Sequence, residues 1–403
     1  MTLGIGKTII IVLDGFGVGE QPDAYLFESR RANTLSHLSE VKDKLRIPNL
    51  VHLGLSNLTY IKHWPRDEET TGFFGKAAQK NEANDSIGGH REILGVYSEK
   101  KLNNFSTGID PETMQVLTQI TGKRFLGNSN DHQQDFLAKY GEAHLKNGDP
   151  IILVTDDSLV HIYVHEEKFQ PDEFYMLGHS VWEVLSEHGL GRLHVHYFTG
   201  DLNAFTTETN MPVAMFNVPP RNSTLVSNLY DNGIPVFAIG KVSEMLEGNS
   251  VKESWSVKNN NEALEKLNLL IREGATNRQE QALIVANLPD FDLLHGHNRD
   301  PHGYIKALEN FDQYLPRIFR SMKNEDILYI TSDHGNDPTA EGTLHTREYV
   351  PLLVHSRMFR PRRKANLGIR TSLADIAETI AESYDINVHF AANSFWGEMI
   401  SQL

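Results

Sequence analysis

Residues 331–337 place an aspartate and a histidine, Asp333 and His334, side by side, and another histidine, His345, follows after a short acidic loop. Carboxylate oxygens and imidazole nitrogens together are the donors that Zn²⁺ or Mn²⁺ accepts. A polar surface loop with His345 exposed would have the same composition. This segment alone therefore leaves a metal site and a plain loop open.

Two other segments offer the same donors after an apolar run. Asp14 follows residues 8–13 and precedes glycines that let the backbone approach a ligand. A helix cap or a turn is the alternative for this aspartate. Asp292 and His297 follow the apolar run 282–287. Six donors exceed what one ion usually takes from a protein, so the sequence favours two neighbouring metal ions.

Ser86 is the candidate nucleophile. It follows Asp85 and precedes the pair Gly88-Gly89, which predicts a tight turn feeding a helix that begins near Gly89, with the hydroxyl over free helix N–H groups. An ordinary serine N-cap is the alternative. This stretch shows no partner for proton transfer, so activation of the hydroxyl would have to come from a metal ion.

Buried strands are expected to position these groups. The apolar, β-branched runs 8–13, 282–287 and 327–330 are typical of strands covered on both faces of a mainly parallel sheet. Active sites of open α/β sheets lie at the carboxyl ends of such strands. A fourth run, 235–239, ends at Lys241, which can reach a phosphate or remain solvated. Helices are predicted to begin at 32–35 and 47–50 and to span 261–273 and, as the final helix, 372–384.

Residues 102–220 have a different pattern and predict a separate α/β unit. It should contain a helix over 131–146, a strand over 150–155, a helix over 174–188 and a strand over 193–198. The alternating His194 and His196 of the last strand favour an exposed strand face. The expected domains are a core of residues 1–101 and 221–403 and an inserted cap of residues 102–220.

Composition excludes several classes of protein. The 403 residues include 38 basic and 53 acidic side chains, a net charge of −15, which argues against nonspecific nucleic-acid binding. No apolar run is long enough to span a bilayer, and residues 1–7 do not have the pattern of a signal peptide. The absence of cysteine excludes disulfides and thiolate ligands. We expect a cytoplasmic protein with neither nucleic-acid nor membrane partners.

The sequence resembles the phosphopentomutases of the alkaline phosphatase superfamily over nearly its whole length. The resemblance is carried by the segments 12–17, 32–35, 85–90, 240–243, 292–304, 332–337 and 345–350. It implies an alkaline-phosphatase-like α/β core with a mainly parallel sheet flanked by helices, and a smaller α/β cap. It also implies two divalent ions, usually manganese in that family, with Zn²⁺ as the alternative.

The resemblance further implies a role for each donor. One ion is expected on Asp292, His297 and His345, and the other on Asp14, Asp333 and His334 together with Ser86. The resemblance and the local pattern together give a set of expected substrate contacts: Thr155, Asp157, Lys241, Arg91 and His196. The family uses threonine where this chain has Ser86, and its two cap arginines are absent; one of their positions corresponds to His196. Imidazole does not replace a bidentate guanidinium clamp on phosphate.

Three functions follow as hypotheses. The first is a mutase that moves a phosphoryl group between hydroxyls of ribose phosphate, deoxyribose phosphate or a related phosphosugar through phosphorylated Ser86, with a sugar bisphosphate as intermediate and activator. The second is a phosphohydrolase, in which water discharges phosphorylated Ser86. The third is a metal-binding or partner-binding protein without catalysis, against which the full set of donors argues.

Overall fold

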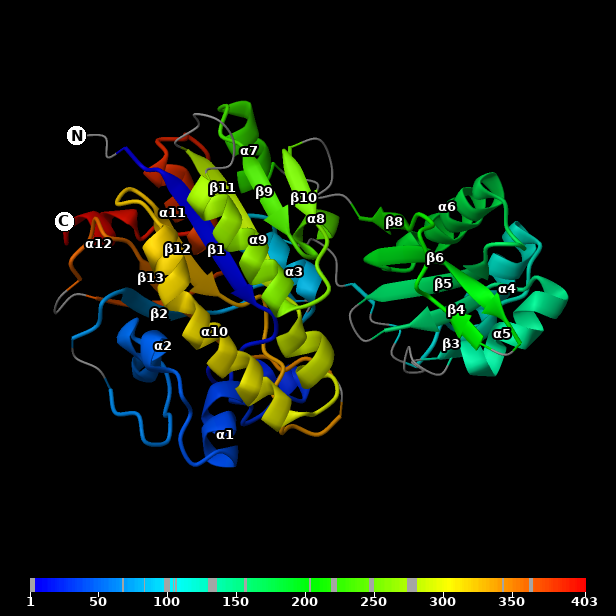
Figure 1. Ribbon diagram of the computed structural model, residues 1–403, viewed down its shortest axis with the longest axis horizontal. Helices are drawn as coiled ribbons and strands as arrows, with labels where there is room; N and C mark the ends of the chain where they lie inside the picture. Colours follow the sequence, from blue (N-terminus) through cyan, green and yellow to red (C-terminus); the bar gives the residue numbers. More distant parts are fainter. Residues whose placement is uncertain are drawn as a thin grey trace. The chain divides into compact units, whose positions relative to one another are not determined.

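The computed structural model describes the chain except residues 1–3, 67–68, 83, 98–101, 104, 106, 130–135, 156–157, 203, 219–222, 246–249, 274–280, 343 and 362–364. The chain divides into two compact units (Figure 1). The larger unit comprises residues 1–98 and 220–403, and the smaller unit, which we call the cap, comprises residues 99–219.

The larger unit is built around one sheet with the strand order β10-β9-β11-β1-β12-β13-β2-β14. The first five strands of this order pair in parallel, whereas β13 pairs antiparallel with both β12 and β2. The strands are β1 (Lys7–Leu13), β2 (Phe73–Ala77), β9 (Val236–Ile239), β10 (Glu253–Trp255), β11 (Ala282–Leu288), β12 (Ile327–Thr331), β13 (Val350–His355) and β14 (Asn366–Arg370). The predicted mainly parallel sheet is therefore confirmed.

Helices cover both faces of this sheet, as Figure 1 shows. Alternate residues of β1 enter different cores: Ile9 and Ile11 pack with α9 and α10, whereas Ile10 and Val12 pack with α7 and α11. A strand buried on both faces has no polar side, which explains the uninterrupted apolar run. The helical segments are η1 (Ala24–Phe27), α1 (Thr34–Val41), α2 (Pro48–His52), η2 (Leu55–Asn57), α3 (Ser86–Ile93), α7 (Leu225–Asp231), α8 (Val242–Met245), α9 (Asn260–Glu273), η3 (Phe291–Gly296), α10 (Pro301–Ser321), α11 (Asp375–Ser383) and α12 (Trp396–Ile400).

The cap has its own sheet, with the order β3-β4-β5-β6-β7 and β8 paired to β6. Its strands are β3 (Leu126–Ser129), β4 (Ile151–Val154), β5 (Leu159–His165), β6 (Arg192–Asp201), β7 (Ala204–Thr206) and β8 (Ala214–Asn217). Its helices are α4 (Pro111–Thr121), α5 (Phe136–Asn147) and α6 (Pro171–Glu187).

Most predicted elements are confirmed within a few residues. The helix over 372–384 is shorter, α11, and it is not the last, because the short α12 follows it. The predicted cap helix begins, in the described part of the chain, at Phe136. Among the described residues, no helix has both the length and the apolar character required to cross a bilayer.

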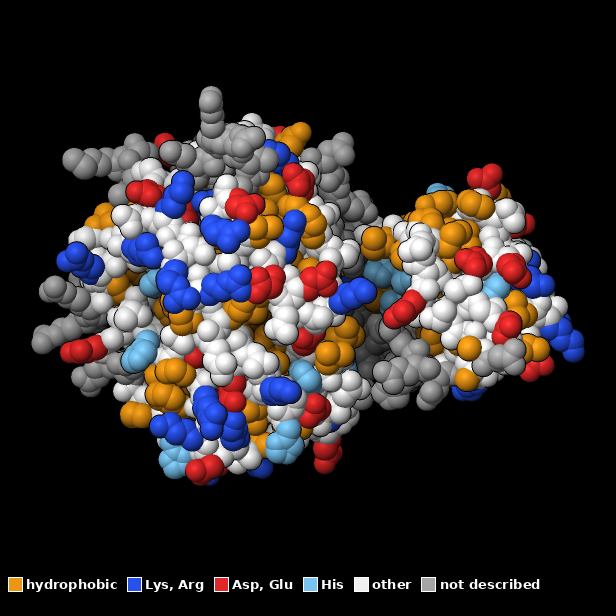
Figure 2. Space-filling view, in the orientation of Figure 1, with side chains coloured by type: hydrophobic (Ala, Val, Ile, Leu, Met, Phe, Trp, Pro, Cys, Tyr) orange, Lys and Arg blue, Asp and Glu red, His pale blue; other side chains and the backbone are white. Residues whose placement is uncertain are grey.

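Charged side chains of both signs are interspersed over the face of the larger unit that Figure 2 presents. Although the net charge of the chain is −15, the described part of this face carries no continuous acidic patch. The three carboxylates predicted as metal donors, Asp14, Asp292 and Asp333, are buried instead.

Candidate metal centre

Four neighbouring parallel strands, β9, β11, β1 and β12, end at one edge of the larger sheet. Asp14 follows β1 directly, and Asp333 follows β12 after one residue. Asp292 lies in η3, which follows β11, and Lys241 follows β9. The strand order thus gathers groups that lie hundreds of residues apart in the chain.

Ser86 is the first residue of α3, and the N-cap is Asp85, whose side chain accepts a hydrogen bond from the Gly88 amide (2.6 Å). The prediction that the helix begins near Gly89 is wrong, because both glycines lie inside the helix. Gly89 permits close packing: a Cβ there would lie 2.2 Å from the Asp333 carbonyl oxygen. Gly89 therefore lets the helix pack against the backbone of Asp333, in the loop that follows β12.

The Ser86 hydroxyl lies between two cationic or basic groups. Lys241 Nζ donates to Ser86 Oγ at 2.6 Å, and His334 Nε2 is 3.1 Å from the same oxygen. Lys241 Nζ also lies 2.7 Å from Asp14 Oδ2. This places the serine beside the first group of donors, in a site where Ser86, Asp14 and His334 are all buried.

The first group of donors consists of Asp14, Asp333 and His334, whose ligand atoms lie within 4.8 Å of one another. His334 Nε2 is 3.2 Å from Asp333 Oδ2 and 3.8 Å from Asp14 Oδ1. Burial, followed by repulsion from Asp333, raises the pKa of Asp14 to about 7. Burial alone would lower the pKa of His334, but the neighbouring carboxylates, Asp333 first, raise it to about 10. These shifts show how strongly the site favours an added positive charge.

The second group lies beside the first and consists of Asp292, His297 and His345. His297 Nε2 is 3.3 Å from Asp292 Oδ2, and His345 Nε2 is 3.5 Å from Asp292 Oδ1. The rings of His345 and His334 are stacked, with centroids 3.8 Å apart. Burial opposes ionisation of Asp292, but the two imidazoles overcome it and hold the pKa of this carboxyl well below its usual range.

The donor set fits divalent metal ions. Asp14 Oδ1 is buried and, in the described part of the chain, has no hydrogen-bond partner. Asp292, His334 and His345 also bring their ligand atoms within 4.8 Å of one another, so His334 stands between the two groups. Three buried carboxylates with three imidazoles supply the mixed oxygen and nitrogen donors of Zn²⁺ or Mn²⁺ sites.

Sequence reasoning missed two residues that hold these donors in place. Asn287 Nδ2 donates to Asp14 Oδ2 (2.9 Å), and Asn287 Oδ1 lies 3.0 Å from His90 Nε2. His90 Nδ1 lies 3.1 Å from Asp333 Oδ2. Two signals were available: His90 is four residues after Ser86 on the same helix face, and Asn287 is a lone polar residue in an apolar strand. Partners of this kind fix the orientation of metal ligands.

Gly15 allows two of the donor loops to approach each other. Its φ of +74° lies in the left-handed region, and a Cβ there would be 3.0 Å from Asp292 Oδ1. Its amide donates to Asp333 Oδ1 at 3.1 Å. A side chain at this position would strain the backbone and press on a donor carboxylate.

The predicted substrate contacts fall into different parts of the molecule. Lys241 lies in the site, as described above. Arg91 is buried on α3, and its Nε donates to the carbonyl of Met245 (3.3 Å). Thr155 and His196 belong to the cap, and Asp157 lies outside the described residues.

The prediction of an exposed face for His194 and His196 is wrong. Only 8% of the His194 surface is exposed, and His196 is half-buried. Both residues lie beside a third cap histidine, His161. Alternation along a strand shows which residues share a face, but it does not show whether another layer covers that face.

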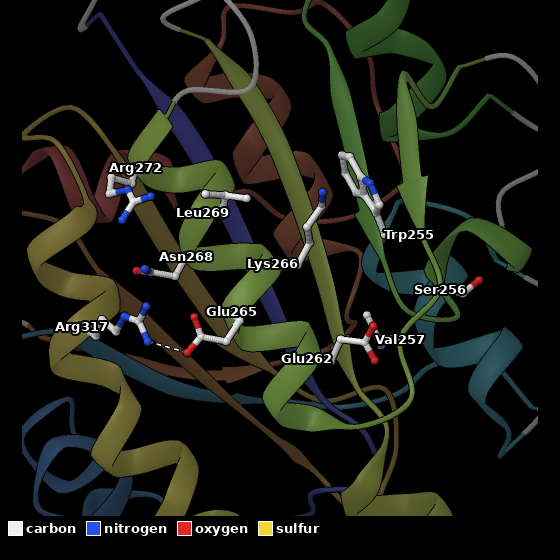
Figure 3. Close-up of a pocket in the computed structure, with 10 residues that line it drawn as sticks. All are labelled: Trp255, Ser256, Val257, Glu262, Glu265, Lys266, Asn268, Leu269, Arg272 and Arg317. Atoms are coloured by element: carbon white, nitrogen blue, oxygen red, sulfur yellow. Dashed lines mark hydrogen bonds and ion pairs between the residues drawn. The ribbon is translucent and has the colours of Figure 1, made fainter.

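A surface hollow elsewhere in the larger unit has a different chemistry. Figure 3 shows it between α9, α10 and the segment that starts at Trp255. Lys266 Nζ lies 3.8 Å from the centroid of a Trp255 ring, and Glu265 pairs with Arg317. None of the metal donors predicted from the sequence lines this hollow, so it does not compete with the centre at the strand ends.

Comparisons with known proteins cover almost the whole chain. Residues 6–388 match the family model described as the metalloenzyme superfamily. A phosphopentomutase of Caldanaerobacter subterraneus subsp. tengcongensis is 36% identical over 394 residues, which are 98% of this chain and 98% of that protein. A phosphopentomutase of Desulfitobacterium hafniense is 36% identical over 98% of this chain and 100% of its own length. One of Dictyoglomus thermophilum is 34% identical over 96% and 97%.

Proposed function

The chain belongs to the phosphopentomutase family of the metalloenzyme superfamily, and from this premise we propose that it moves a phosphoryl group between two hydroxyls of a pentose phosphate through Ser86. Ribose or deoxyribose phosphate is the proposed substrate, with a sugar bisphosphate as activator. The observation that carries the proposal is the position of Ser86 Oγ, 2.6 Å from Lys241 Nζ and 3.1 Å from His334 Nε2.

Two divalent ions are part of the proposal, manganese before zinc. Asp292, His297 and His345 would hold one, and Asp14, Asp333 and His334 with Ser86 would hold the other. When bound, such ions lower the pKa of a coordinated hydroxyl and neutralise phosphoryl oxygens. Asn287 and His90 keep two of the donor carboxylates in position through the contacts described above.

The proposed transfer occurs in two balanced steps. Phosphorylated Ser86 gives its phosphoryl group to a free sugar hydroxyl: the Oγ–P bond breaks, a sugar O–P bond forms, and the proton of that hydroxyl passes to the released Ser86 oxygen. The bisphosphate then turns, and its other phosphoryl group returns to Ser86: the second sugar O–P bond breaks, the Oγ–P bond forms again, and the proton of the Ser86 hydroxyl passes to the released sugar oxygen. Lys241 supports both steps because its ammonium group lies beside the oxygen on which negative charge develops.

A second candidate function is hydrolysis of a phosphosugar. The observation that favours it is the environment of His196, which stands at an expected phosphate contact but belongs to a cluster of cap imidazoles. A site that holds the bisphosphate less firmly lets water reach phosphorylated Ser86. Hydrolysis and mutase chemistry share phosphorylated Ser86 and differ in the acceptor of its phosphoryl group.

The two functions separate in one experiment. The purified protein with Mn²⁺ is given ribose 1-phosphate, deoxyribose 1-phosphate and a catalytic amount of the corresponding bisphosphate, and ³¹P NMR follows the products. Isomer without inorganic phosphate supports the mutase, whereas inorganic phosphate alone contradicts it.

Ser86 is tested by two matched variants in the same assay. Ser86→Ala removes the nucleophile and should lower turnover by at least about 1,000-fold. Ser86→Thr keeps a hydroxyl, as in the family, and should retain measurable turnover. Full turnover by Ser86→Ala would show that another group accepts the phosphoryl group.

A further inference from the structure

Three histidines of the cap converge on one face of its sheet: His161 on β5, and His194 and His196 on β6. In the parallel register of these strands His161 is paired with His194, and Tyr163 with His196. The intervening residues Val160, Ile162, Leu193 and Val195 belong to the apolar core on the opposite face. The three imidazoles therefore share one side of two neighbouring strands.

Their nitrogen atoms are close enough for one ion. One nitrogen from each ring lies within 4.8 Å of the others. His161 Nδ1 and His196 Nε2 are 2.9 Å apart. Two nitrogens bound tetrahedrally to zinc at about 2.05 Å are separated by about 3.3 Å, so this pair would have to move apart by only a few tenths of an ångström.

The surroundings hold the rings in place and keep them neutral. The Tyr163 ring stacks on His196, with centroids 4.8 Å apart and planes at 16°. His161 and His194 are 7% and 8% exposed. Burial lowers the pKa of His196 to about 4, which favours the neutral ring with a lone pair on one nitrogen. Neutral imidazole is the form that binds metal ions.

We propose that the cap binds one divalent transition-metal ion of the zinc class through His161, His194 and His196. Three imidazoles without a carboxylate suit Zn²⁺, Co²⁺, Ni²⁺ or Cu²⁺ and disfavour Mg²⁺ and Mn²⁺, which prefer oxygen donors. The cap site thus differs in selectivity from the carboxylate-rich centre of the larger unit. Three protein ligands leave a fourth tetrahedral position for water or an anion.

Two features of the cap oppose metal binding: a hydrogen bond between two of the imidazoles and a nearby positive charge. The ion has to replace the hydrogen bond between His161 and His196. Burial lowers the pKa of His161, and His196, His194 and the charge of Arg192 add to the shift; this charge also repels a cation. Three metal–nitrogen bonds of about 2 Å are shorter than the distance over which the charge of Arg192 acts, so we expect coordination to outweigh the repulsion. A nitrogen of His196 that binds the ion cannot also contact a sugar phosphate. His196 is then a metal ligand and not the substrate contact expected from the sequence.

The test counts metal ions without using activity. The full-length protein is stripped with a chelator, dialysed against Zn²⁺ or Co²⁺, and its bound metal is measured by mass spectrometry. His161→Gln, His194→Gln and His196→Gln are compared with wild type and with His188→Gln, which removes an exposed cap histidine outside the cluster. All these proteins share the centre of the larger unit, so a difference in metal content reports on the cap.

Wild type and His188→Gln should each hold one ion more per chain than the three cluster variants. With Co²⁺, wild type and His188→Gln should also show stronger ligand-field absorption than the cluster variants. Equal metal content in all the proteins would overturn the proposal. Zinc-loaded crystals of the wild type provide a measurement that needs no variant. An anomalous-scattering peak among the three rings is expected, and its absence would refute the cap site even if the variants misfold.

Discussion

Replacing Gly89 by alanine tests the packing that brings Ser86 to the carboxyl edge of the sheet. Alanine is normally favoured over glycine inside a helix by about 1 kcal/mol. At this position, however, the added Cβ would lie 2.2 Å from the Asp333 carbonyl oxygen, where ordinary contact begins at 3.4 Å. The difference between these values, about 1.2 Å, has to be taken up by α3 or by the β12 loop.

Gly89→Ala should lower both the free energy of unfolding and the turnover rate. Overpacking of this kind costs about 1–3 kcal/mol and is offset by about 1 kcal/mol of helix propensity, so we expect a net loss of up to about 2 kcal/mol. A shift of about 1 Å between Ser86 and Asp333 should lower phosphoryl transfer by about 100-fold. Urea unfolding followed by tryptophan fluorescence measures the first effect, and ³¹P NMR measures the second.

Gly397→Ala is the matched control. Gly397 also lies in a helix, α12, but no described atom outside the nearby backbone of that helix comes within 4 Å of its added Cβ. This variant should be as stable as wild type or more stable by up to about 1 kcal/mol, with unchanged turnover. If Gly89→Ala matched Gly397→Ala in both measurements, the close packing of α3 on the Asp333 backbone would be refuted.

Three further predictions concern the charges of the larger unit. Lys241→Met should lower turnover by about 100-fold, measured by ³¹P NMR, because the variant loses the cation 2.6 Å from Ser86 Oγ; unchanged turnover would remove Lys241 from the site. Chelation should abolish turnover and lower the thermal unfolding temperature, since bound metal favours the folded state, and added Mn²⁺ should restore both; a metal-free protein with full stability would contradict the metal centre. Burial raises the pKa of Asp312, despite its hydrogen bonds from Leu50 and Asn49, above the usual aspartate value of 3.8. The stability that protonated Asp312 provides is therefore present below about pH 4 and is lost as the pH rises through the folded-state pKa. Urea unfolding should show wild type losing stability relative to Asp312→Asn from about pH 4 to about pH 7. A difference that does not change with pH would contradict the raised pKa of Asp312.

Local patterns in the chain were sufficient for the strands and for the type of donor that follows each one. Residues 8–13, 282–287 and 327–330 form strands as predicted, because a run of apolar β-branched residues has few other stable environments. Because these apolar runs are easy to recognise, the aspartates that come after them, Asp14, Asp292 and Asp333, could also be identified from the sequence. The roles of these donors as metal ligands, and of Ser86 as nucleophile, remain predictions that the experiments above address.

Local patterns were misleading where a second layer decides the outcome. The pair Gly88-Gly89 indicated a turn, but both residues lie in a helix that needs glycine to approach Asp333. The alternation of His194 and His196 indicated an exposed face, but the face is largely buried beside His161. A residue's neighbours along the chain carry little information about what packs over it from another segment.

The sequence by itself determined that Asp14, Asp292 and Asp333 follow buried strands, since apolar periodicity is a local property of the chain. Only the tertiary structure decided that these strands, β1, β11 and β12, are neighbours, that Lys241 reaches Ser86 from 155 residues away, and that three cap histidines meet. The physical reason is that strand order and layer packing arise from contacts between distant segments. Such contacts depend on how whole faces fit together, and no short stretch of residues records that fit.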